Sequence, residues 1–125
     1  MSENEISGIL VDIFINVHKK LGPGLLESVY ESAICYELDK KGLSFTQQQV
    51  IPVIYDEITL DRGFRADLIV ENKVIVEIKS VEILNPVTYK IVLTYLRLSG
   101  IRLGLIANFS VPLMKDGITR LVNNL

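Results

Sequence analysis

The 125-residue sequence lacks several features that would define other classes of protein. Its one cysteine, Cys35, excludes an intrachain disulfide framework and fits a reducing compartment, so a cytoplasmic location is expected. No stretch approaches the roughly 18 uncharged apolar residues of a membrane span, and no membrane partner is expected. Eight glycines and four prolines are too few to indicate wholesale disorder. The acidic, polar start of the sequence argues against a signal or transit peptide.

The size and charge of the chain narrow the choice further. With 49% hydrophobic residues, a chain of this length favours a single domain, residues 1–125, with a core of its own. The net charge is −2, so the chain as a whole is no polycation. Residues 83–125, however, carry five basic side chains against one acidic one. This basic third is a weak hint of a polyanionic partner, and on this feature alone an ordinary solvated surface is the favoured explanation.

The spacing of apolar residues predicts helices in four segments. The first two run from about Asn4 to Leu21 and from about Leu25 to Lys41, with apolar positions three and four residues apart. Gly22-Pro23-Gly24 separates them because glycine and proline cannot continue the helical hydrogen bonds cheaply. A third helix is expected from Asn85-Pro86 to Gly100, and a last one from about Leu113 to Asn123.

The segments between these helices predict strands. They cover residues 45–55, then Ile58, Leu60 and 64–70, then 74–79 and 101–109, and Pro52 indicates an edge strand or a bulge in the first of them. The resulting order is α-α-β-β-β-α-β-α. Strands on both sides of a crossover helix imply an α/β fold, with a mixed β-sheet flanked by helices.

Charged residues on the predicted hairpin of residues 65–79 are the most informative feature. A two-residue turn would put Asp67 and Glu77 on opposite faces of the sheet. A three-residue turn over Glu71-Asn72-Lys73 places Asp67 directly opposite Glu77, with Lys79 on the same face. We predict the second register, because Asn72 tolerates the left-handed conformation that such a turn needs. The opposite face is then continuously apolar through Leu68, Val70, Val74, Val76 and Ile78.

Two opposed carboxylates repel each other unless a cation or a proton lies between them. Their Cβ atoms would be about 4.5–5.5 Å apart. Oxygen-rich sites of this kind suit Mg²⁺ or Mn²⁺, with Asp67, Glu77 and the Ile78 main-chain carbonyl as ligands. Lys79 could then orient an attacking water or stabilise the developing charge. The alternative interpretation is a salt-bridged patch of Asp67, Glu77 and Lys79 on a solvated sheet face.

Gly24, Glu27 and Tyr30 form a second candidate group, because a spacing of three places them on one side of a helix. Glu27 flanks a buried face, where a lone carboxylate would be costly. A third carboxylate at a metal site explains it. Alternatively, Glu27 interacts with the helix dipole and Tyr30 is a core aromatic. Tyr95, in the third helix, either stacks near the site or belongs to the core.

Together these motifs resemble the GxxExxY protein family, within the PD-(D/E)XK nuclease superfamily. The resemblance covers nearly the whole chain. Val17–Tyr30 is similar to the signature segment, and Arg65–Leu68 with Glu77–Ser80 is similar to the paired catalytic motifs. Leu93–Leu98 and Gly104–Phe109 resemble later blocks. One position departs from the pattern, because Ile91 stands where members often carry a glutamine four residues before Tyr95.

The resemblance implies a restriction-endonuclease-like αβββαβ core with extra helices. It implies that Asp67 and Glu77 hold Mg²⁺, that Lys79 assists the attacking water and that Glu27 is the helix carboxylate of the site. The expected reaction is hydrolysis of a nucleic-acid phosphodiester, with DNA favoured over RNA.

Two further hypotheses stay open beside a nuclease. A catalytically inactive module with the nuclease fold could bind nucleic acid or protein, as Ile91 and the modest net charge suggest. A structural homo-oligomer, such as a homodimer, could use Pro52 and its edge strand as the contact.

Overall fold

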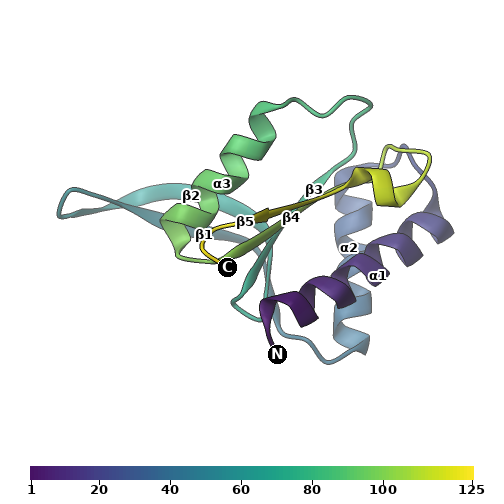
Figure 1. The fold of residues 1–125 in the computed structure, drawn as a ribbon, viewed down its shortest axis with the longest axis horizontal. Coiled ribbons are helices and arrows are strands. Elements are labelled where there is room, and N and C mark those ends of the chain that lie inside the picture. Colours follow the sequence, from purple (N-terminus) through teal and green to yellow (C-terminus); the bar gives the residue numbers. More distant parts are fainter.

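The computed structural model describes residues 1–125 and places nine elements along the chain. Two helices come first, followed by three strands, a third helix, a strand, a short 3₁₀ turn and a last strand (Figure 1). Their bounds are α1 Glu3–Leu21, α2 Glu27–Lys40, β1 Phe45–Tyr55, β2 Ile58–Val70, β3 Val74–Lys79, α3 Val87–Ser99, β4 Leu103–Asn108, η1 Met114–Gly117 and β5 Ile118–Val122.

The five strands form one mixed sheet in the order β1-β2-β3-β4-β5. Only β3 and β4 are parallel, and α3 is the crossover between them. Helices α1 and α2 lie on one side of the sheet and α3 lies on the other (Figure 1). The predicted α/β class, with a mixed sheet flanked by helices, is therefore confirmed and is consistent with a restriction-endonuclease-like fold.

Two apolar clusters of unequal size hold the layers together. The larger cluster contains 20 buried residues between α1, α2 and the sheet, and it includes the predicted apolar face of β2 and β3. The smaller cluster contains five buried residues on the α3 side: Phe64, Ala66, Ile69, Ile75 and Leu96. Because Ile75 and Glu77 share a face of β3, the charged face of the hairpin lies on the side of the smaller cluster.

The first two helices begin and end at recognisable signals. Ser2 and Glu5 form a capping box at the start of α1, and Gly22 ends the helix with a φ of 77° that favours glycine. The hydroxyl of Tyr30, in α2, closes the loop between the helices by donating to the Gly22 carbonyl at 2.6 Å and accepting from the Leu25 N–H at 3.1 Å. None of the helices combines the length and the apolar character that crossing a membrane requires.

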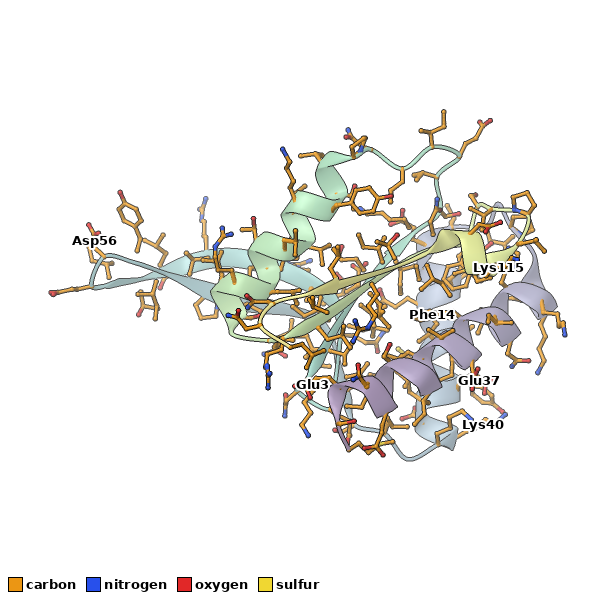
Figure 2. All side chains as sticks on the ribbon, viewed as in Figure 1. Glu3, Phe14, Glu37, Lys40, Asp56 and Lys115 are labelled. Atoms are coloured by element: carbon orange, nitrogen blue, oxygen red, sulfur yellow. The ribbon has the colours of Figure 1, made fainter.

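Strands β1 and β2 continue beyond the sheet as a two-stranded arm, with Asp56 at its tip (Figures 1 and 2). Pro52 lies at a register shift of the edge strand β1, as its position predicted. The opposite strand carries Gly63 there, where a Cβ atom would lie only 1.6 Å from the Ile51 carbonyl oxygen. Large apolar side chains near the tip are exposed, and Ile54, Tyr55 and Ile58 are 70%, 66% and 62% exposed.

The predicted last helix from Leu113 to Asn123 is wrong. The segment forms η1 and then β5, which pairs antiparallel with β4 from Ala107↔Ile118 to Leu103↔Val122. Three of the five residues of β5 are β-branched, which favours a strand, and the free edge of β4 supplies the hydrogen bonds. Gly117 allows the turn because a Cβ there would lie 2.1 Å from the Asn108 carbonyl oxygen.

Candidate active site

The β2–β3 hairpin has the register that the sequence predicted. Val70 pairs with Val74, Ile69 with Ile75, and Leu68 with Val76. The turn therefore contains three residues, two of which, Glu71 and Asn72, have φ values of 53° and 56°. The next positions in this register are Asp67 and Glu77, so the turn brings the two acidic residues opposite each other.

The two strands separate at these acidic residues, and side chains replace the missing backbone pairs. Asp67 Oδ2 accepts the Ile78 N–H at 2.8 Å, and Glu77 Oε1 accepts the Asp67 N–H at 3.3 Å. Each carboxylate therefore binds the backbone of the opposite strand. These two hydrogen bonds fix both acidic groups at the fork between β2 and β3.

Glu77 lies in an environment that opposes its ionisation. Only 9% of the residue is exposed. Burial, first, and the charge of Asp67, second, raise the pKa of the Glu77 carboxyl from 4.5 to about 7. The Asp67 N–H and Lys79 lower this pKa in part, whereas Glu27 raises it. A cation between Asp67 and Glu77 would offset the repulsion and the loss of hydration together.

Lys79 follows Glu77 two residues along β3, hence on the same face of the strand. It is half-buried and makes no ion pair with either carboxylate, because the one ion pair of the chain joins Lys40 to Glu37 at 3.5 Å. The alternative interpretation of a salt-bridged patch is therefore not what the structure contains. The ammonium group stays available for a ligand.

Glu27 connects the start of α2 to the end of β3. Its Oε2 accepts the Ser80 N–H at 3.3 Å, and the Ser80 hydroxyl donates to the Leu25 carbonyl at 2.6 Å. Glu27 and Ser80 also line an open pocket of about 450 Å³. The chain contains no group of three or more Asp, Glu, His or Cys side chains placed to hold a metal ion, so Glu27 does not complete a three-carboxylate cluster.

The two candidate tyrosines have different surroundings. Tyr30 is fully buried, stacks on Phe109 at 4.3 Å between ring centroids and uses its hydroxyl in the loop before α2. Tyr95 stacks on Phe64 at 4.1 Å. Burial, and then the charges of Glu77 and Asp67, raise the pKa of the Tyr95 hydroxyl. Tyr95 is therefore close enough to the acidic pair to feel its charge. Tyr30, by contrast, holds in place the loop between α1 and α2 that precedes Glu27.

Three residues that the sequence did not single out for the site support it. The Gln48 amide donates to Asp67 and also to Glu31, so Glu31 is connected to Asp67 only through Gln48. Asn108, the last residue of β4, is buried and binds both backbone polar groups of Val81, at 3.1 and 2.9 Å. The run Gln47-Gln48-Gln49 in a predicted strand was a signal, but the register of β1 against β2 was needed to place Gln48 opposite Asp67.

The donor set fits a hard divalent cation such as Mg²⁺. Asp67 and Glu77 offer carboxylate oxygens at one point, and a Mg²⁺ site in a protein often uses only one or two carboxylates and several waters. The repulsion between Asp67 and the buried Glu77 explains why a cation would be favoured there. Asp67 and Glu77 supply oxygen ligands only, whereas structural zinc sites are built mainly from cysteine sulfur and histidine nitrogen.

The chain matches a family model that is described as the PD-(D/E)XK nuclease superfamily, over residues 4–121. The match therefore includes both helices before the sheet, all the site residues described above and nearly all of β5. Searches among curated proteins and among solved structures return no match.

Proposed function

Because the chain belongs to the PD-(D/E)XK nuclease superfamily, we propose that it is a Mg²⁺-dependent nuclease that hydrolyses phosphodiester bonds. One observation carries the proposal. The fork between β2 and β3 holds the Asp67 carboxylate beside a buried Glu77 whose pKa is raised to about 7. A buried carboxyl with a like-charged neighbour is typical of a functional site.

In this proposal Asp67 and Glu77 hold the cation, with the Ile78 carbonyl as a further ligand. Both side chains are already oriented by hydrogen bonds to the opposite strand, which reduces the ordering needed on binding. When bound, Mg²⁺ or Mn²⁺ would polarise a phosphate oxygen and make a nearby water more acidic. The carboxylates supply the negative charge that selects a divalent cation.

Lys79 is the proposed partner of the reacting phosphate. Its ammonium group is on the Glu77 face and free of ion pairs, so it can orient the attacking water or stabilise charge on a phosphate oxygen. Glu27 borders the open pocket beside Ser80 and is proposed as the helix carboxylate of the site. Tyr95 is proposed to contact the substrate next to the acidic pair.

Membership of the narrower GxxExxY family is a further proposal. The residues Gly24, Glu27 and Tyr30 support it, because Gly24, with a φ of 91°, lies in the loop that the Tyr30 hydroxyl closes, and Glu27 is the first residue of α2 after that loop. DNA is the favoured substrate by the same resemblance. The basic side chains of residues 83–125 support a polyanion of either kind.

An assay on single-stranded, duplex and branched DNA and on RNA, with Mg²⁺ and with chelator, tests the proposal. Replacing Lys79 by alanine should lower the rate by about 10²–10³-fold, the usual cost of losing one transition-state donor. Lys73→Ala, in the turn before β3, is the matched control and should keep the wild-type rate. Equal rates for Lys79→Ala and wild type would remove the lysine from the mechanism.

The second candidate function is an inactive module that binds nucleic acid or protein. Ile91 favours it, because this side chain is 41% exposed on α3 and cannot donate or accept a hydrogen bond. Binding of DNA without metal-dependent cleavage of any substrate would support the module over the nuclease.

Pairing of two copies through the β1 edge stays a prediction. The exposed apolar residues of the arm, Ile54, Tyr55 and Ile58, are the surface that a second copy would cover. Light scattering on the purified chain should then give about twice 14.1 kDa. A mass of one chain across a concentration series would contradict it.

A further inference from the structure

Gln48 has an unusual backbone conformation for its place in the fold. Five residues other than glycine have a positive φ, and four of them lie in the two hairpin turns or next to the C-terminus: Asp56, Glu71, Asn72 and Asn124. Gln48, with a φ of 52°, is the one inside a strand. Such a conformation is costly for a residue with a long side chain, so a compensating role is expected.

Gln48 lies at a point where β1 and β2 both turn over, meaning that the side chains that faced one side of the sheet before this point face the other side after it. Phe45 and Val70 are paired and pack with the larger cluster, whereas Ile51 and Phe64 are paired and pack with the smaller cluster on the opposite side. Simple alternation would leave all four on one face. The paired positions stop at Gln47↔Leu68 and resume at Gln49↔Ala66, so the turnover lies at Gln48 and Asp67.

The Gln48 side chain uses this turnover to reach the site. Its amide nitrogen donates to Asp67 Oδ1 at 3.1 Å and to Glu31 Oε1 at 2.8 Å. The other oxygen of Glu31 accepts from Gln47 at 3.0 Å, which anchors the glutamate on α2. One N–H of the amide therefore faces each carboxylate, and the amide separates two negative charges that would otherwise repel each other.

These contacts leave the Asp67 carboxylate held from both sides. Gln48 binds Oδ1, and the Ile78 N–H binds Oδ2 at 2.8 Å. Each oxygen keeps a further lone pair for a cation. Without Gln48, only one hydrogen bond would fix the orientation of this carboxylate, and the Glu31 charge would face it without the intervening amide.

We propose that Gln48, anchored by Glu31, is a positioning residue that orients the Asp67 carboxylate for cation binding. The role in cation binding rests on the proposed function. The orientation of Asp67 does not, because it rests on hydrogen bonds between protein groups alone. The two parts can therefore be tested separately.

The first test measures the amide hydrogen exchange of Ile78 by NMR in metal-free protein. The Ile78 N–H donates to Asp67, so its protection reports how firmly the carboxylate is held. Gln48→Gly removes the side chain and tolerates the positive φ, so the fold should be kept. We expect Ile78 exchange to be about fivefold faster in this variant, as for the loss of one hydrogen bond at an exposed position.

Two comparisons make this readout specific. The amide of Val76, within the paired part of the hairpin, should exchange as in wild type, because a general loosening would affect both. The side chain of Gln49 bonds only to Thr46. Gln49→Ala should therefore leave the exchange rate of the Ile78 amide unchanged. Equal Ile78 exchange in wild type and Gln48→Gly would overturn the proposal, and so would equal acceleration of Ile78 and Val76.

The second test is Mg²⁺ calorimetry on the same variants. Gln48→Gly should bind about tenfold more weakly than wild type, as for loss of a group that holds a metal-binding side chain in place, and Gln49→Ala should bind as wild type does. Unchanged affinity in Gln48→Gly beside a wild type that binds would overturn the role of Gln48 alone. No binding by wild type would overturn the proposed function and the role in cation binding, while Ile78 exchange still decides whether Gln48 orients Asp67.

Discussion

The sheet face under α1 and α2 and the face under α3 differ in size and in chemistry. The first buries a cluster of 20 residues, and the second buries five and carries Glu77 beside them. The larger cluster therefore supplies most of the hydrophobic stabilisation. The smaller side can hold a buried carboxylate that lowers stability when it is charged. Every buried side-chain nitrogen or oxygen nevertheless has a hydrogen-bond partner. The site is therefore well ordered, although its charged carboxylate lowers the stability of the fold.

The largest effect on stability should come from the face under α1 and α2. Phe14 is fully buried there and packs edge-to-face on Phe109 at 6.2 Å between centroids. Phe14→Ala should lower the free energy of unfolding by about 3–5 kcal/mol, which urea denaturation measures. A loss below about 1 kcal/mol would show that this face does not carry the stability.

The next effect should come from Glu77 and should depend on pH. The carboxyl has a pKa of about 7 in the folded chain and 4.5 as its ordinary value, so the folded state binds the proton more tightly. Its contribution is fully present below pH 4.5 and is lost as pH rises through 7. In chelator at pH 8, Glu77→Gln should therefore be more stable than wild type, by up to about 3 kcal/mol.

Urea denaturation of both proteins from pH 4 to pH 8 checks this sign. The difference in unfolding free energy should grow with pH and be smallest at the acid end, because the neutral amide resembles a protonated carboxyl. A difference that stays constant across the range would mean that Glu77 does not titrate in this window.

The smallest effect should come from the stack between Tyr95 and Phe64 on the α3 side. Tyr95→Leu should cost about 1 kcal/mol of unfolding free energy, the value of an aromatic pair beyond its buried area. Tyr95→Phe keeps the stack and is the matched control. If Tyr95→Leu cost as much as Phe14→Ala, the two faces would not differ in the way proposed.

The sequence predicted the hairpin of the site because local rules decide it. Strict alternation marks the apolar face of β2 and β3, and Asn72 suits the left-handed turn that sets Asp67 opposite Glu77. The same rules could not place Gln48. There both strands turn over at a strained residue, and alternation no longer predicts which face a side chain occupies.

The predicted helix at residues 113–123 was wrong for a different reason. Residues 113–123 have helical spacing of apolar positions, but the unpaired edge of β4 and the β-branched residues of 118–122 make a strand more favourable. The spacing of apolar residues alone cannot predict a strand that forms because a distant strand offers it hydrogen bonds. The contacts of Asn108 with Val81, and of Glu27 with Ser80, likewise depend on segments that are distant in sequence.

Calorimetric titration of the metal-free chain with Mg²⁺ tests most directly whether Asp67 and Glu77 share a cation. We predict one bound ion for the wild type, with an affinity at least about 100-fold lower in Asp67→Ala. Asp61→Ala, an exposed residue of the same strand, should bind as the wild type does. No binding by the wild type, or equal binding by the wild type and Asp67→Ala, would contradict the account.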